Sequence, residues 1–101
     1  MRLCDLLPIG SVVLLKNAQK KIVIIGVMPI KHIENGKDIA YDYVGVPYPE
    51  GYIGQESAML FNHDNIEEIT FRGYSDAERL ILIETIQKMV DKTDDIIRKT
   101  K

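Results

Sequence analysis

The stretch SVVLLKNAQKKIVIIGVM, residues 11–28, decides the fold of this chain. Two short apolar runs rich in β-branched residues are separated by a polar loop that contains an asparagine, a pattern that predicts a β-hairpin. Neither run alternates apolar and polar residues, so we expect both faces of these strands to be covered. The hairpin therefore predicts central strands of a sheet that curls over itself or is covered by a helix.

A second hairpin follows in IKHIENGKDIAYDYVGV, residues 30–46. Asn35-Gly36 is a strong turn signal, because both residues tolerate the positive φ that a tight hairpin demands. In the second arm, apolar and polar residues alternate. This pattern places Ile39, Tyr41 and Tyr43 on the inward face of one strand.

The next segment, residues 47–61, is predicted to be a long irregular connection. Tyr48-Pro49-Glu50-Gly51 fits a β-turn with proline at its second position and glycine at its fourth. Tyr48 and Tyr52 flank this turn without an assigned core position. Tyrosine offers a large contact area at low entropic cost, so this Tyr/Pro connection is a candidate protein-binding surface.

The segment FNHDNIEEITFRGY, residues 61–74, is predicted to open with one helical turn. Asp64 and Glu67 have the spacing that satisfies free backbone N–H groups at a helix start. A strand follows, with Ile69 and Phe71 expected on its inward face.

One long helix is predicted from Asp76 to about Lys99, where the chain has no glycine or proline. Ser75-Asp76-Ala77-Glu78 has the pattern of a capping box. The apolar face of the helix consists of Leu82, Ile83, Ile86, Met89, Val90, Ile96 and Ile97, with Thr93 in the same stripe. About twenty-four residues make a helix about 36 Å long, so its end is expected to project beyond the sheet as a partner or dimer surface. The alternatives are diagonal packing across the sheet and fraying of the helix end.

The fold class predicted from these elements is α+β. We expect four or five mostly antiparallel strands in a small curved sheet, resembling a partly open SH3-like barrel, followed by one long C-terminal helix. A chain of 101 residues suits a single domain. The expected organisation is a β-rich body over residues 1–74 and the helix over residues 75–99.

The composition limits the classes of binding partner and the cellular compartment that we expect. The formal net charge is −2 and the sequence pI is about 5.6, so we expect no binding to nucleic acid or to a membrane. Cys4 is the only cysteine, which excludes an internal disulfide and a cysteine metal cage. Since the chain also shows no signal-peptide pattern, we expect a cytoplasmic protein.

Catalytic and cofactor motifs are weak. His32 and His63 lack metal-ligand spacing, and no phosphate-binding glycine loop is present. We therefore expect no metal, no cofactor and no enzymatic activity. An enzyme acting through Asp42, His63 or Asp64 is the least favoured alternative.

Three segments together resemble a known family. They are LPIGSVVLLKNAQKKIVIIGVM, YDYVGVPYPEGYIG and FNHDNIEEITFRGY, in this order over most of residues 6–74. The chain is similar to small proteins of Gram-positive bacteria (Firmicutes) described only as a domain of unknown function. The family's D-Y-x-G-x-x-YPEG pattern and the position after it fall on Asp42, Tyr43, Gly45, Tyr48, Pro49, Glu50, Gly51 and Tyr52.

The resemblance implies a context and no catalytic residues. Members of the family are encoded beside LXG toxins of the type VII secretion system and their small helical companions. This implies a non-catalytic accessory or targeting factor, or chaperone, that binds the toxin or a helical companion in the cytoplasm, with co-export as an alternative. A toxin-neutralising immunity or regulatory protein is the second hypothesis. The candidate binding residues are Tyr48, Pro49, Tyr52, Met89, Ile96 and Ile97, and a homodimer through the C-terminal helix is a further alternative.

Overall fold

The computed structural model describes residues 5–32 and 38–100, with only the backbone described for residues 31–32 and 93–100. The chain divides into two compact units, Leu6–Tyr74 and a unit that contains the C-terminal helix. The boundary between them falls between residues 74 and 75. Each unit is described below by itself.

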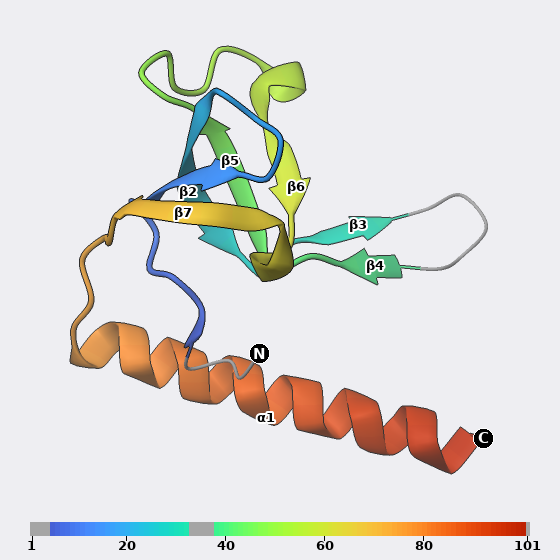
Figure 1. Ribbon diagram of the computed structural model, residues 1–101. Helices are drawn as coiled ribbons and strands as arrows, with labels where there is room; N and C mark the ends of the chain where they lie inside the picture. Colours follow the sequence, from blue (N-terminus) through green and yellow to red (C-terminus); the bar gives the residue numbers. More distant parts are fainter. Residues whose placement is uncertain (1–4, 33–37, 101) are drawn as a thin grey trace. The chain divides into compact units, whose positions relative to one another are not determined.

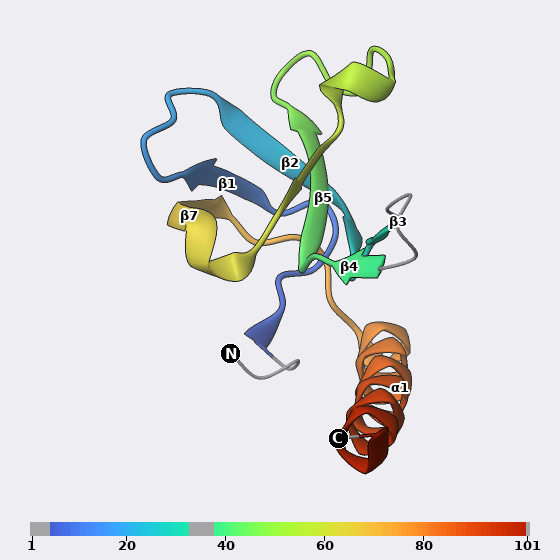
Figure 2. The same cartoon turned by 90° about the vertical axis from the view of Figure 1, so that its right-hand side faces the viewer.

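A five-stranded antiparallel sheet forms the first unit, in the order β6-β5-β2-β1-β7 (Figures 1 and 2). Its strands are β1 (Val12–Leu15), β2 (Lys21–Val27), β5 (Tyr43–Pro47), β6 (Met59–Phe61) and β7 (Ile66–Phe71). The sheet is open, because β6 and β7 are its two edges. With the C-terminal helix, this architecture confirms the predicted α+β class. Strand β6 lies inside the segment predicted to be irregular, so that part of the prediction was wrong.

A separate two-stranded ladder joins β3 (Ile30–His32) to β4 (Asp38–Ala40). The Asn35-Gly36 turn predicted for this hairpin lies outside the described residues. The single strand predicted over Ile39, Tyr41 and Tyr43 is divided, because β4 ends at Ala40 and β5 begins at Tyr43. Of the three side chains predicted to be inward, Tyr43 is fully buried, whereas Ile39 is 41% exposed.

The core of the first unit lies mainly on one face of the sheet, although Val46 of β5, which lies opposite Val23, is buried on the other face. Val13 of β1 lies opposite Ile22 of β2, and both are buried, as is Ile24. The other buried hydrophobic side chains of this unit are Leu6, Leu7, Tyr43, Val46 and Phe61. The expectation that both faces are covered holds only in part, since Ile25 of β2 is 46% exposed.

Two bulges in β7 change the face that its side chains occupy. Ile69 lies opposite Val13, but the next residue pair joins Phe71 to Val12, which leaves Thr70 as the extra residue. The second register shift lies between Glu68 and Ile66, and its extra residue is Glu67. Since a bulge inverts the alternation, Ile69 and Phe71 point to opposite faces. The prediction that Phe71 is inward was wrong, and its side chain is 61% exposed.

Gly45 allows three strands to pack closely. A Cβ atom at this position would lie 2.9 Å from the Val23 carbonyl oxygen and 3.2 Å from the Phe61 ring, and it would also collide with the Ile22 side chain. A register shift in β2 lies directly opposite, between Ile24 and Gly26. The extra residue of this shift is Ile25 of β2.

The second unit contains helix α1 (Ala77–Thr100). The Asp76 side chain accepts a hydrogen bond from the Arg79 backbone N–H at 3.1 Å, and its carbonyl oxygen accepts one from the Leu80 N–H at 3.2 Å. Asp76 therefore caps the helix, one residue later than the predicted Ser75–Glu78 box. Ile83 is the only helix side chain in the buried core among the described residues.

Candidate functional site

The Tyr/Pro loop, residues 48–58, connects β5 to β6. The Tyr48–Pro49 peptide bond is cis, and the Gly51 N–H donates to the Pro47 carbonyl oxygen at 2.7 Å. The turn thus starts one residue earlier than predicted, and Pro49 does not occupy its second position. Gly51 adopts a φ of 78°, a conformation that favours glycine.

Two bonds attach this loop to the start of β2 and to the residue that precedes it. The Tyr48 N–H donates to the Lys21 carbonyl oxygen at 2.9 Å, and the Lys20 ammonium lies 2.6 Å from the Glu50 carboxylate. The hydrogen bond from Lys20, followed by one from the Glu50 backbone N–H, lowers the pKa of the Glu50 carboxyl below its ordinary value of 4.5. Figures 1 and 2 show the Tyr/Pro loop and the connection between β1 and β2 at the same end of the sheet.

The second half of the loop closes on itself. The Ser57 hydroxyl donates to the Gly54 carbonyl oxygen at 2.6 Å and accepts the Ile53 N–H at 3.1 Å. Ser57 is the last residue of a short 3₁₀ turn, η2 (Gln55–Ser57). These bonds give the loop a defined conformation although none of its side chains is buried.

The loop presents large side chains to solvent. Tyr48 is 48% exposed, Tyr52 is 60% exposed and Ile53 is 69% exposed. Tyr48 and Tyr52 were predicted binding residues, and neither ring is buried in the core. Ile53 was not predicted, because an isolated isoleucine in a sequence is usually assigned to the core.

The helix residues proposed for binding are described only in part. Met89 of α1 is 64% exposed. The side chains of Ile96 and Ile97 lie outside the described residues. Since Met89 belongs to the second unit, its position relative to the Tyr/Pro loop is not defined.

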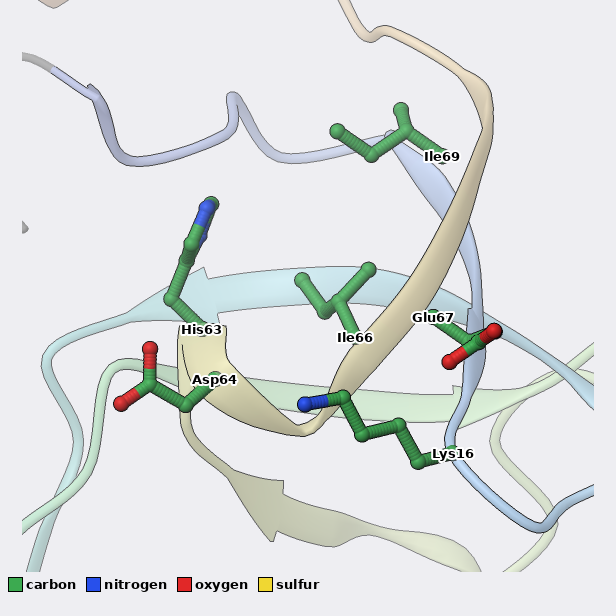
Figure 3. A pocket seen from close by; sticks show the side chains of 6 residues that line it. All are labelled: Lys16, His63, Asp64, Ile66, Glu67 and Ile69. Atoms are coloured by element: carbon green, nitrogen blue, oxygen red, sulfur yellow. The ribbon is translucent and has the colours of Figure 1, made fainter.

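A shallow pocket of about 440 Å³ lies beside β7, and both charged and apolar side chains line it (Figure 3). It is lined by Lys16, His63, Asp64, Ile66, Glu67 and Ile69. Figure 3 shows the His63 ring and the Asp64 carboxylate pointing apart, so these neighbours do not form an acid–base pair with each other. Asp42, the third residue of the enzyme hypothesis, is not among the lining residues.

Asp42 and His63 instead form hydrogen bonds that join two segments of the chain, residues 42–43 and residues 62–63. The Asp42 carboxylate accepts the His63 backbone N–H at 2.8 Å, and the Asp42 N–H donates to the Asn62 side-chain oxygen at 3.1 Å. The His63 Nδ1 atom lies 2.7 Å from the Tyr43 hydroxyl group. These bonds attach the start of β5 to the 3₁₀ turn η3 (His63–Asn65).

The helical turn predicted before β7 is confirmed as η3, but its cap differs. The Asn65 side-chain oxygen accepts the Asn62 N–H at 2.8 Å, and the Asn65 N–H donates to the Asn62 carbonyl oxygen at 2.9 Å. The cap therefore uses Asn62 and Asn65, two residues before the predicted pair of Asp64 and Glu67.

No group of three or more His, Cys, Asp or Glu side chains among residues 5–32 and 38–100 could hold a metal ion. Within the same part of the chain, no helix has the length and hydropathy needed to cross a membrane.

Comparisons with known proteins give a family but no activity. No curated protein and no solved structure matches the chain. The family model described as "Domain of unknown function (DUF4176)" matches residues 6–82. This match covers the whole five-stranded sheet, the Tyr/Pro loop and the start of α1. The chain therefore belongs to the DUF4176 family of domains of unknown function.

Proposed function

We propose that this protein is a non-catalytic protein-interaction module, and that it acts as an accessory or targeting factor for an LXG toxin exported by type VII secretion. The observation that carries the interaction role is the Tyr/Pro loop. Its tyrosines are about half exposed or more, yet its backbone is fixed by bonds from Tyr48, Glu50 and Ser57. A fixed loop loses little conformational entropy on binding, and exposed tyrosines supply contact area.

The toxin context rests on the family resemblance of the sequence. That resemblance runs through the Tyr/Pro loop itself, at Tyr48, Pro49, Glu50 and Gly51. The proposed partner is the helical N-terminal region of the toxin, or one of its small helical companions. Met89, Ile96 and Ile97 on α1 are proposed as a second contact surface for this partner.

A co-expression capture experiment tests this function. The chain is expressed with the helical and the toxic regions of the LXG protein from the same locus, each carrying its own affinity tag. We expect capture by the helical region, and a loss of about tenfold or more in affinity when Tyr48 and Tyr52 are both replaced by alanine, since buried interface tyrosines are often energetic hot spots. Tyr74→Ala is the matched control, because Tyr74 is also exposed but lies outside the loop.

The other possible outcomes of this experiment distinguish the alternative functions. Capture by the toxic region, with suppression of its activity in a growth assay, would replace the targeting role with an immunity role. Capture by neither region would reject both interaction roles for this locus. Capture that the double alanine variant leaves unchanged would remove the Tyr/Pro loop from the interface.

A further inference from the structure

The five-stranded sheet has a second face that is apolar and partly open. In an antiparallel ladder, directly opposite residues point to the same face. Val13 lies opposite both Ile22 and Ile69, and the burial of Val13 and Ile22 identifies the inner face. The residues on either side of Val13 in β1 must point the other way. We call the face to which they point the outer face.

Two rows of side chains cross the outer face. The first row consists of Phe71, Val12, Val23 and Val46, on β7, β1, β2 and β5. The second row consists of Glu68, Leu14 and Lys21, on β7, β1 and β2. Val46 is buried, whereas Val12, Leu14 and Val23 are half-buried and Phe71 is 61% exposed. The outer face is thus an apolar strip in which Leu14 lies between a cation, Lys21, and an anion, Glu68.

The charges in the second row are arranged in a self-complementary way. Lys21 and Glu68 lie on either side of β1, so they are about 10 Å apart at the usual strand spacing. Among the described residues, neither has an ion-pair partner within 4.0 Å. A two-fold axis parallel to β1 and above Leu14 would bring Glu68 of one copy over Lys21 of the other, and the reverse. The same axis would bring the two Leu14 side chains together.

We propose that the outer face binds a second copy of this chain by face-to-face sheet packing, with two reciprocal Lys21–Glu68 ion pairs around a Leu14–Leu14 contact. An isologous interface needs a self-complementary surface, and this row supplies one. Sheets that pack face to face lie about 10 Å apart, which is within reach of lysine and glutamate side chains. This dimer also gives a reason why β1 and β2 are apolar on both faces.

The oligomeric state tests the inference, independently of any toxin partner. Sedimentation equilibrium on the full chain, up to about 500 µM because small interfaces are often weak, is expected to show a monomer–dimer equilibrium. Lys21→Glu and Glu68→Lys each place like charges at both reciprocal contacts, so each is expected to weaken the dimer about tenfold. The double variant K21E/E68K exchanges the charges and is expected to restore the dimer.

Lys16→Glu and Glu67→Lys are matched controls. Both residues line the pocket beside β7, and neither belongs to the two rows of the outer face. These variants are expected to leave the dimer unchanged, and circular dichroism confirms that all variants are folded. A chain that stays monomeric over the whole range would overturn the proposal. A dimer affinity that neither single charge reversal changes would also overturn it, as would a double variant whose dimer affinity is not restored.

Discussion

At the scale of single residues, Tyr43 joins three parts of the first unit. Its hydroxyl oxygen accepts the Leu7 backbone N–H at 2.9 Å and lies 2.7 Å from the His63 Nδ1 atom. Its ring lies 5.3 Å from the Phe61 ring, measured between centroids. One buried tyrosine thus connects the segment before β1, strand β6 and the turn η3.

Tyr43→Phe is therefore expected to destabilise the protein by about 1–3 kcal/mol, because the buried Leu7 N–H loses its acceptor. Chemical unfolding in urea measures this difference. Tyr52→Phe is the matched control, because its ring is 60% exposed, and it is expected to change the free energy of unfolding by less than about 0.5 kcal/mol. Equal stabilities of the two variants would mean that the Tyr43 hydroxyl does not contribute to the folded state.

At the scale of secondary structure, the sequence predicts the elements with long uniform patterns. The apolar runs of β1 and β2 and the glycine-free stretch of α1 are recognisable because many consecutive residues give the same signal. Strand β6 has only three residues, which is too short for a periodic pattern to appear. The outward position of Phe71 depends on a bulge at Thr70, and this register is set by pairing with β1.

The sequence also predicts only part of the candidate site. The density of tyrosine, proline and glycine in residues 48–52 marks the Tyr/Pro loop in the sequence. The ion pair between Lys20 and Glu50 could not be predicted, because it joins two loops that the sheet order brings together. The outer face was missed for the same reason. It is visible only once the register places Glu68, Leu14 and Lys21 in one row.

The attachment of the Tyr/Pro loop to the β1–β2 connection can be measured through Glu50. Its pKa is lowered in the folded protein, so the ion pair stabilises the fold above the ordinary pKa of 4.5, and this contribution is lost as the pH falls through the lowered pKa. NMR titration is expected to show a Glu50 pKa below 4.5 that returns toward this value in Lys20→Met. Lys16→Met is the control. A Glu50 pKa that does not change in Lys20→Met would show that the ion pair is absent in solution.

At the scale of the whole molecule, the chain consists of two units with very different cores. Every buried hydrophobic side chain among the described residues except Ile83 belongs to the unit Leu6–Tyr74. The buried polar residue Ser11 also belongs to it, and its hydroxyl donates to the Pro8 carbonyl oxygen at 2.7 Å and accepts the Gly73 N–H at 2.9 Å. This last bond joins the N-terminal and C-terminal segments of the unit.

A chain truncated after Tyr74 is therefore expected to fold without the helix. All the described buried hydrophobic side chains except Ile83, and the Ser11–Gly73 bond, belong to the truncated chain, so circular dichroism should show a β-rich spectrum and heating should give one cooperative transition. Ser11→Ala in the truncated chain is expected to lower the free energy of unfolding by about 1–3 kcal/mol, because the Gly73 N–H loses its acceptor. A truncated chain that unfolds without a cooperative transition would show that the helix is part of the folding unit.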